Sequence, residues 1–154
     1  MDLVVNEWLP EYFRPDASVE EKQLLKTFLT KFESSNDRII VRRPSPFLNK
    51  FYRYASEFQN LDEVVTPIRE FLTTKILNIE RCIFIDTDEK KPLPESLIEK
   101  LSLGNYNSDQ YLFEAASCVE GERMVVTTDA KLKTHLQEED WCKVVLLSDF
   151  LKTY

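Results

Sequence analysis

The stretch Asn107–Asp129, NSDQYLFEAASCVEGERMVVTTD, carries the clearest structural pattern in the chain. Asn107 and Ser108 are residue types that favour the N-cap of a helix, and the apolar residues after them fall on one helical stripe. Gly121 is expected to end this helix. Met124–Val126 is then a short apolar run typical of a buried strand. The stretch therefore predicts a helix followed by a strand.

Two aspartates mark the ends of this unit. Asp109 falls in the first turn of the predicted helix, and Asp129 comes just after the predicted strand. If the strand is parallel to the one before the helix, the right-handed crossover brings both aspartates to the carboxyl edge of the sheet. Open α/β proteins bind their ligands at that edge. Two carboxylates there predict a site for a divalent metal ion.

Length and composition favour one globular domain that spans residues 1–154. Hydrophobic residues make up 43% of the chain and charged residues 31%, which is the balance of a soluble protein rather than a disordered one. No apolar run approaches the length of a membrane span, and the first residues lack the pattern of a secretion signal. Three cysteines, far apart in apolar runs, predict reduced thiols in a cytoplasmic protein.

The net charge of −7 argues against a broad coat of nucleic acid, although it leaves room for a local basic channel. Two glycines in the whole chain exclude a glycine-rich phosphate loop. An enzyme that acts on phosphodiesters can still be acidic overall, because a bound cation supplies positive charge at the reaction centre.

Short apolar runs alternate with amphipathic helical patterns along the chain. This alternation predicts a three-layer α/β/α sandwich around a mostly parallel sheet of four or five strands. The strands at Leu3–Val5 and Met124–Thr127 are expected to be neighbours near its centre. The five predicted strands are Leu3–Val5, Arg38–Val41, Arg81–Ile85, Met124–Thr127 and Val144–Leu147.

The last third of the chain resembles the carboxyl half of a PIN domain. The resemblance lies in SDQYLFEAA, in ERMVVTTDAKL and in a final strand followed by SDFL. PIN domains are typically ribonucleases that hold one or two Mg²⁺ or Mn²⁺ ions with three or four carboxylates. Asp109 and Asp129 match two of these acids, and Thr127 and Thr128 match the hydroxyls beside the last one.

The first half departs from the family pattern at two acidic positions. The opening aspartate of the family falls on Asn6, with Glu7 next to it, and the glutamate of the following helix falls near Asn49-Lys50. Glu7 is therefore expected to be the third acidic metal ligand, and Asn6 can add an amide oxygen. A cation at Lys50 is expected to stabilise the negative charge of a phosphoryl transition state.

The resemblance also predicts the substrate and the partners. Arg42, Arg43 and Arg53, together with Lys50, are expected to guide the backbone of a single-stranded nucleic acid, most naturally RNA. PIN domains of bacteria are often the toxin of a toxin–antitoxin pair, so the resemblance implies an antitoxin or another protein partner. It is also compatible with a homodimer.

Two other interpretations stay open. In the first, the fold has lost its chemistry and serves as a binding or scaffold module, which the missing acids at Asn6 and Asn49-Lys50 favour. In the second, the chain is a different α/β sandwich whose aspartates only stabilise helices. Asp109 would then favour a helix N-terminus through its charge, and Asp129 would cap the helix that begins at Lys131.

Overall fold

Five short strands pair side by side in a computed structural model that describes residues 1–154. All four pairings are parallel, and the order across the sheet is β3-β2-β1-β4-β5. Isoleucine and valine dominate the strands, as expected for strands that are covered on both faces. The strands are β1 (Asp2–Val5), β2 (Arg38–Arg43), β3 (Cys82–Asp86), β4 (Met124–Thr127) and β5 (Lys143–Leu146).

The predicted neighbours at the centre of the sheet are confirmed. β1 pairs with β4 so that Val4 lies opposite Val125 and Val5 opposite Val126. Because the two strands run in the same direction, their carboxyl ends leave the sheet next to each other. The residues that follow β1 therefore meet the residues that follow β4.

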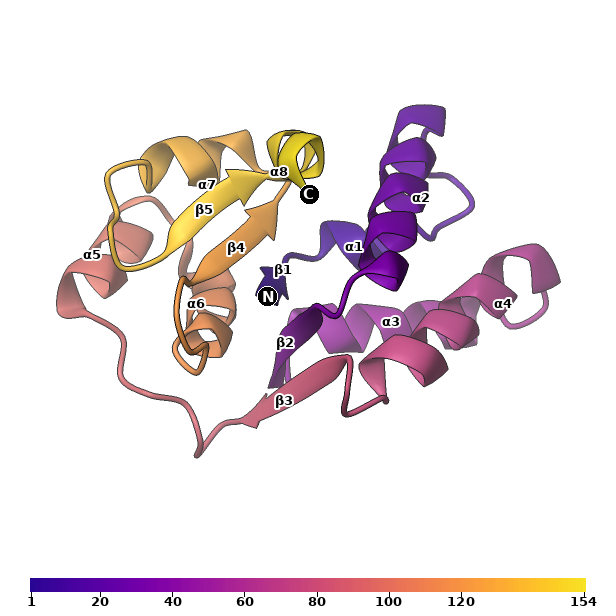
Figure 1. The fold of residues 1–154 in the computed structure, drawn as a ribbon, viewed down its shortest axis with the longest axis horizontal. Coiled ribbons are helices and arrows are strands. Elements are labelled where there is room, and N and C mark those ends of the chain that lie inside the picture. Colours follow the sequence, from indigo (N-terminus) through magenta and orange to yellow (C-terminus); the bar gives the residue numbers. More distant parts are fainter.

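Helices cover both faces of the sheet, so the three-layer sandwich is confirmed (Figure 1). Alternate strand residues point to opposite faces, as the pleat of a strand requires. Leu3 and Val5 enter a core of 24 buried residues shared with α1–α4 and α8, whereas Val4 enters a core of 15 shared with α5–α7. The helices are α1 (Trp8–Glu11), α2 (Val19–Ser34), α3 (Pro46–Glu57), α4 (Asp62–Phe71), α5 (Glu95–Leu103), α6 (Gln110–Ala116), α7 (Ala130–His135) and α8 (Leu147–Thr153).

Side chains of the preceding residues cap the starts of α2 and α3. Ser18 and Glu21 form the reciprocal hydrogen bonds of a capping box at the start of α2. Ser45 accepts a hydrogen bond from the backbone N–H of Leu48, and Pro46 occupies the first position of α3. This fixes the direction of α3, which carries Lys50 in its second turn.

The segment around Asp109 differs from its prediction. Asn107 and Ser108 do not cap a helix, because Asn107–Asp109 forms a turn of 3₁₀ helix with no capping side chain. The α-helix proper begins at Gln110 and ends at Ala116, five residues before Gly121, which was expected to end it. Asp109 therefore lies at the junction of the two helix types rather than inside an α-helical first turn.

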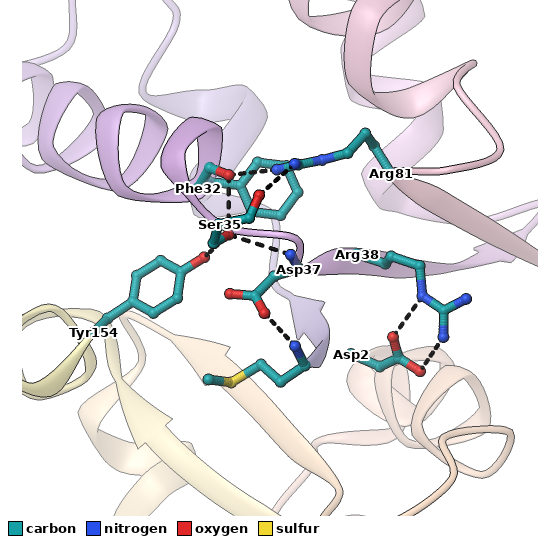
Figure 2. Close-up of polar contacts among 8 residues, drawn as sticks. Asp2, Phe32, Ser35, Asp37, Arg38, Arg81 and Tyr154 are labelled. Atoms are coloured by element: carbon teal, nitrogen blue, oxygen red, sulfur yellow. Dashed lines mark hydrogen bonds and ion pairs between the residues drawn. The ribbon is translucent and has the colours of Figure 1, made fainter.

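Polar contacts hold both chain termini to one end of the sheet (Figure 2). The amino group of Met1 forms an ion pair with the buried carboxylate of Asp37, just before β2. The Tyr154 hydroxyl lies 3.0 Å from the Ser35 hydroxyl, and the Arg81 guanidinium donates to the Ser35 carbonyl at 2.6 Å. This cluster lies at the amino end of β2, opposite the carboxyl edge. None of the helices has the length and apolar character needed to cross a bilayer.

Candidate functional site

The exits of β1 and β4 are tied together by hydrogen bonds around Asn6. The Asn6 backbone N–H donates to the Val126 carbonyl at 3.1 Å, and its side-chain amide donates to the Thr127 hydroxyl at 3.0 Å. The amide oxygen of Asn6 accepts the backbone N–H of Glu7 at 2.6 Å. Asn6 therefore fixes the geometry of this edge, and its side-chain oxygen is already engaged.

Asp109 is a half-buried carboxylate at the same edge. Its side chain makes no capping hydrogen bond to the helix that follows it. Burial, the largest cause, and the negative charges of Asp129 and Glu7 together raise the pKa of Asp109 to about 6. The three predicted acids therefore lie near enough to repel one another, as the topology of the sheet predicted.

Asp129 follows β4 and caps α7. Its Oδ1 atom accepts the backbone N–H groups of Lys131 and Leu132 at 2.9 and 3.0 Å. The Asp129 backbone N–H donates to the Thr127 hydroxyl at 3.0 Å, so the buried Thr127 accepts hydrogen bonds from both strand exits. The helix-capping role is therefore real. Because both caps use Oδ1, Oδ2 stays free for another partner.

Lys50 points toward the carboxylates of α1 and its start, not into bulk solvent. Its ammonium lies 3.0 Å from Oε1 of Glu7 and also pairs with Glu11. Burial lowers the pKa of Lys50, but the hydrogen bonds and charges of Glu11 and Glu7 outweigh burial and raise the pKa overall. Lys50 is therefore a fixed cation beside the site, and it neutralises one of the three predicted metal ligands.

Tyr111 places an unpaired polar atom next to these acids. Its hydroxyl is inaccessible to solvent and has no hydrogen-bond partner. Burial raises the pKa of the Tyr111 hydroxyl, and the charges of Glu7 and Asp109 raise it further. The sequence analysis did not single out Tyr111. The only sign of its place near the site was its position, two residues after Asp109.

The three arginines predicted to bind substrate all have partners in the protein. Arg42 forms a largely buried ion pair at 2.6 Å with Glu114, a residue of α6 that sequence reasoning did not single out. Arg43 makes a two-pronged contact with Asp86 at 2.7 and 2.8 Å. Arg53 has no acidic partner and donates to the Tyr54 hydroxyl at 3.2 Å. Of the three, Arg53 alone keeps an uncompensated charge.

The two threonines beside Asp129 have different environments. Thr127 is fully buried and joins the hydrogen bonds described above, whereas Thr128 is exposed to solvent at the start of the turn into α7. Only Thr128 is therefore accessible to a ligand. Thr127 acts through the atoms that it positions.

The oxygen donors that this edge offers to a ligand are two carboxylates and one hydroxyl. Asp109 has no ion-pair partner, Asp129 has an unused Oδ2, and the Tyr111 hydroxyl is an orphaned buried polar atom nearby. Carboxylate oxygens are the ligands that Mg²⁺ and Mn²⁺ prefer. However, no three His, Cys, Asp or Glu side chains are gathered closely enough to form a complete site. Comparisons with protein-family models, curated proteins and solved structures found no match.

Proposed function

We propose that this protein is a nuclease that uses Mg²⁺ or Mn²⁺ to hydrolyse phosphodiester bonds in single-stranded nucleic acid. We propose RNA as its main substrate. One observation carries the proposal: Asp109 is a half-buried carboxylate with no neutralising partner, at an edge that it shares with Asp129 and Glu7. A charge in this condition is costly unless a cation is bound. The resemblance to PIN domains supports the same class of enzyme.

Each of these residues would have its own role in the proposed reaction. Asp109 and Asp129 would hold the cation, which supplies Lewis acidity and lowers the pKa of a water molecule. Lys50, whose ammonium lies 3.0 Å from Oε1 of Glu7, would stabilise the negative charge that develops on the phosphoryl group by exchanging that carboxylate for a phosphoryl oxygen. The site would therefore hold one metal ion where the family pattern allows two.

A second candidate function is a binding module without chemistry. The observation in its favour is that Lys50 is paired with both Glu7 and Glu11, so the third carboxylate is already neutralised. Arg42 and Arg43 are likewise neutralised by acids of the protein. Such a module would bind its partner without needing a divalent ion.

Thermal unfolding with and without Mn²⁺ separates the two functions. The nuclease proposal expects Mn²⁺ to raise the melting temperature of the wild type, with no such gain for Asp129→Asn, which keeps an oxygen for the helix cap. Asp149→Asn, at an exposed aspartate of α8 paired with Lys152, is the matched control and should keep the gain. Equal gains for wild type and Asp129→Asn would contradict the proposal.

A cleavage assay with a fluorescent single-stranded RNA completes the test. The wild type should cut the RNA in Mn²⁺ and not in a chelator, and Asp109→Asn should reduce cleavage at least a hundredfold. RNA binding without cleavage, unaffected by a chelator, would instead favour the binding module. The antitoxin and the homodimer implied by the resemblance stay predictions, which co-purification and light scattering can test.

A further inference from the structure

Tyr106 occupies a tightly built position between α5 and Asp109. The chain leaves α5 through Gly104 and through Asn105, which has a φ of 60°. This bend lays the Tyr106 ring directly over Gly104. A Cβ atom on Gly104 would lie 2.5 Å from Cδ2 of Tyr106 and 2.7 Å from Nε2 of His135. Because Gly104 itself has an ordinary φ of −87°, its close neighbours and not its backbone conformation exclude a side chain.

Tyr106 contacts the two segments that carry the aspartates. Its carbonyl accepts the backbone N–H of Asp109 at 3.0 Å, so it anchors the 3₁₀ turn that leads to that carboxylate. Its ring packs against the ring of His135, with the centroids 5.3 Å apart. His135 ends α7, and the same helix begins at its cap, Asp129. Tyr106 therefore links Asp109, through its backbone carbonyl, to the helix that Asp129 caps, through its ring.

The other contacts of this unit make the link rigid. The His135 ring is also fixed by a contact at 2.5 Å between its Nε2 and the Lys100 carbonyl of α5. The Tyr106 backbone N–H donates to the Leu101 carbonyl at 2.7 Å. Burial raises the pKa of Tyr106, and the negative charges of Asp129 and Asp109 raise it in the same direction. α5, α7 and the Asp109 turn thus all contact Tyr106.

From this geometry we infer that Tyr106 is a positioning residue that sets the separation of Asp109 and Asp129, through the packing of its ring between Gly104 and His135. The inference rests on the proposed function, since the separation matters only if both carboxylates share a cation. It assigns the effect to the ring and its packing, not to the hydroxyl. Substitutions that displace the ring should therefore weaken the cation site, whereas removal of the hydroxyl alone should not.

Mn²⁺ affinity, measured by titration calorimetry and independent of cleavage, tests this assignment. Tyr106→Ala and Gly104→Ala should each weaken Mn²⁺ binding by about tenfold, the lower end of what residues behind the metal ligands contribute. Tyr106→Phe keeps the ring and should bind Mn²⁺ within about twofold of the wild type, below the range expected when a residue behind the metal ligands is lost. Tyr52→Ala removes an exposed tyrosine of α3 and is the matched control for the truncation.

Each outcome has a distinct meaning. Weakening by Tyr106→Ala and Gly104→Ala with retention by Tyr106→Phe supports the inference. Wild-type Mn²⁺ affinity in Tyr106→Ala, even with a lower melting temperature, overturns it, because the ring would then stabilise the fold without setting the site. Equal weakening by Tyr106→Phe and Tyr106→Ala also overturns it. A wild-type protein that binds no Mn²⁺ overturns the proposed function, and the inference falls with it.

Discussion

Asp109 is held in an environment that destabilises its charged form. Its pKa in the folded protein is about 6, above the usual value of 3.8, so the folded state binds the proton more tightly than the unfolded state. The contribution of Asp109 to the free energy of unfolding is therefore largest below about pH 4, and this contribution is lost as the pH rises through about 6. Local destabilisation of this kind is common at sites where a bound ligand offsets it.

Asp109→Asn should consequently stabilise the metal-free protein at neutral pH. In a chelator at pH 7.5 we expect a melting temperature about 2–4 °C above that of the wild type, which corresponds to about 1 kcal/mol for a chain of this size and allows for the half exposure of the group. The difference should disappear near pH 4, where the wild-type carboxyl is protonated. Differential scanning fluorimetry across pH 4–8 measures both quantities.

The control for this prediction is Asp149→Asn, which removes the same charge from an exposed position. The pKa of Asp149 is lowered by its hydrogen bond to Lys152, so its removal should leave the protein no more stable at pH 7.5. Equal melting temperatures for Asp109→Asn and wild type at pH 7.5 would show that the carboxylate is not under strain.

Under the proposed function, Lys50 and a divalent cation would compete for the carboxylate of Glu7. Replacing Lys50 with methionine keeps most of the apolar stem and removes the charge, which frees Glu7. Because a partly exposed ion pair is worth up to about 1 kcal/mol, Mn²⁺ should bind about fivefold more tightly to Lys50→Met. Cleavage of RNA should nevertheless fall, since the fixed charge near the phosphoryl group is lost.

Lys50→Arg tests whether charge alone is sufficient. It should keep the pairing with Glu7 and hence the wild-type Mn²⁺ affinity. Calorimetry and a cleavage assay on the same preparations separate binding from chemistry. Unchanged affinity together with unchanged cleavage in Lys50→Met would remove Lys50 from the site.

Helix α7 depends on an aspartate that also belongs to the candidate metal site. Asp129→Asn keeps an oxygen that can accept the backbone N–H groups of Lys131 and Leu132, whereas Asp129→Ala does not. Asparagine and aspartate are comparable N-caps, and loss of a cap costs about 1 kcal/mol. In a chelator, Asp129→Ala should therefore melt about 2–4 °C below Asp129→Asn.

Both variants should lose the gain in stability from Mn²⁺. This pair of substitutions separates the cap, which only alanine removes, from the cation site, which both remove. Thermal unfolding with and without Mn²⁺ gives the four melting temperatures that this comparison needs, two for each variant. A gain from Mn²⁺ that survives in Asp129→Asn would leave the helix cap as the whole role of Asp129.

The regular elements follow from local sequence where packing and capping agree. The strand at Met124–Thr127 was predicted with its observed bounds, and α3 begins where Ser45 caps it and Pro46 takes its first position. The prediction for Asn107 and Ser108 was wrong, since good capping residues do not force a cap. There the packing of the Tyr106 ring against His135, a tertiary feature, accompanies a tight 3₁₀ turn instead.

The candidate site could be predicted only in part, for a related reason. The order of the predicted strands and helices, with the direction of the chain through them, was sufficient to predict that Asp109, Asp129 and Glu7 lie at one edge of the sheet. They could not show that Arg42 is neutralised by Glu114, 72 positions away, or that Lys50 pairs with Glu11. Pairings between distant side chains depend on the packed structure, and a linear pattern does not contain them.

At the scale of the whole molecule, polar contacts gather at opposite ends of the sheet. The carboxyl edge holds Asp109, which has no ion-pair partner and is repelled by Asp129 and Glu7, whereas the amino end of β2 holds acids and bases that satisfy one another (Figure 2). The first arrangement destabilises the folded protein near neutral pH and the second stabilises it. Changes at the two ends should therefore affect stability independently, since distant sites without shared partners add.

Asp37→Asn tests the stabilising end. Burial raises the pKa of Asp37, but hydrogen bonds from the Met1 amino group, Tyr154 and Ser35 outweigh it and lower the pKa below 3.8. A lowered pKa contributes stability above the unfolded value, and this stability is lost as the pH falls through the folded value. Asp37→Asn should thus reduce stability at pH 7 by about 1.5–3 kcal/mol, as for hydrogen bonds to a charged group.

The pH dependence makes this prediction specific. The deficit of Asp37→Asn relative to the wild type should shrink as the pH falls below about 4, because the wild type then loses the same contribution. Its Mn²⁺ gain should match that of the wild type, and the double variant Asp37→Asn/Asp109→Asn should show the sum of the two single effects within about 0.5 kcal/mol. Urea unfolding at pH 3.5 and pH 7 measures these free energies. A deficit that is equal at both pH values, or a double variant far from additive, would mean that the two ends of the sheet do not act independently.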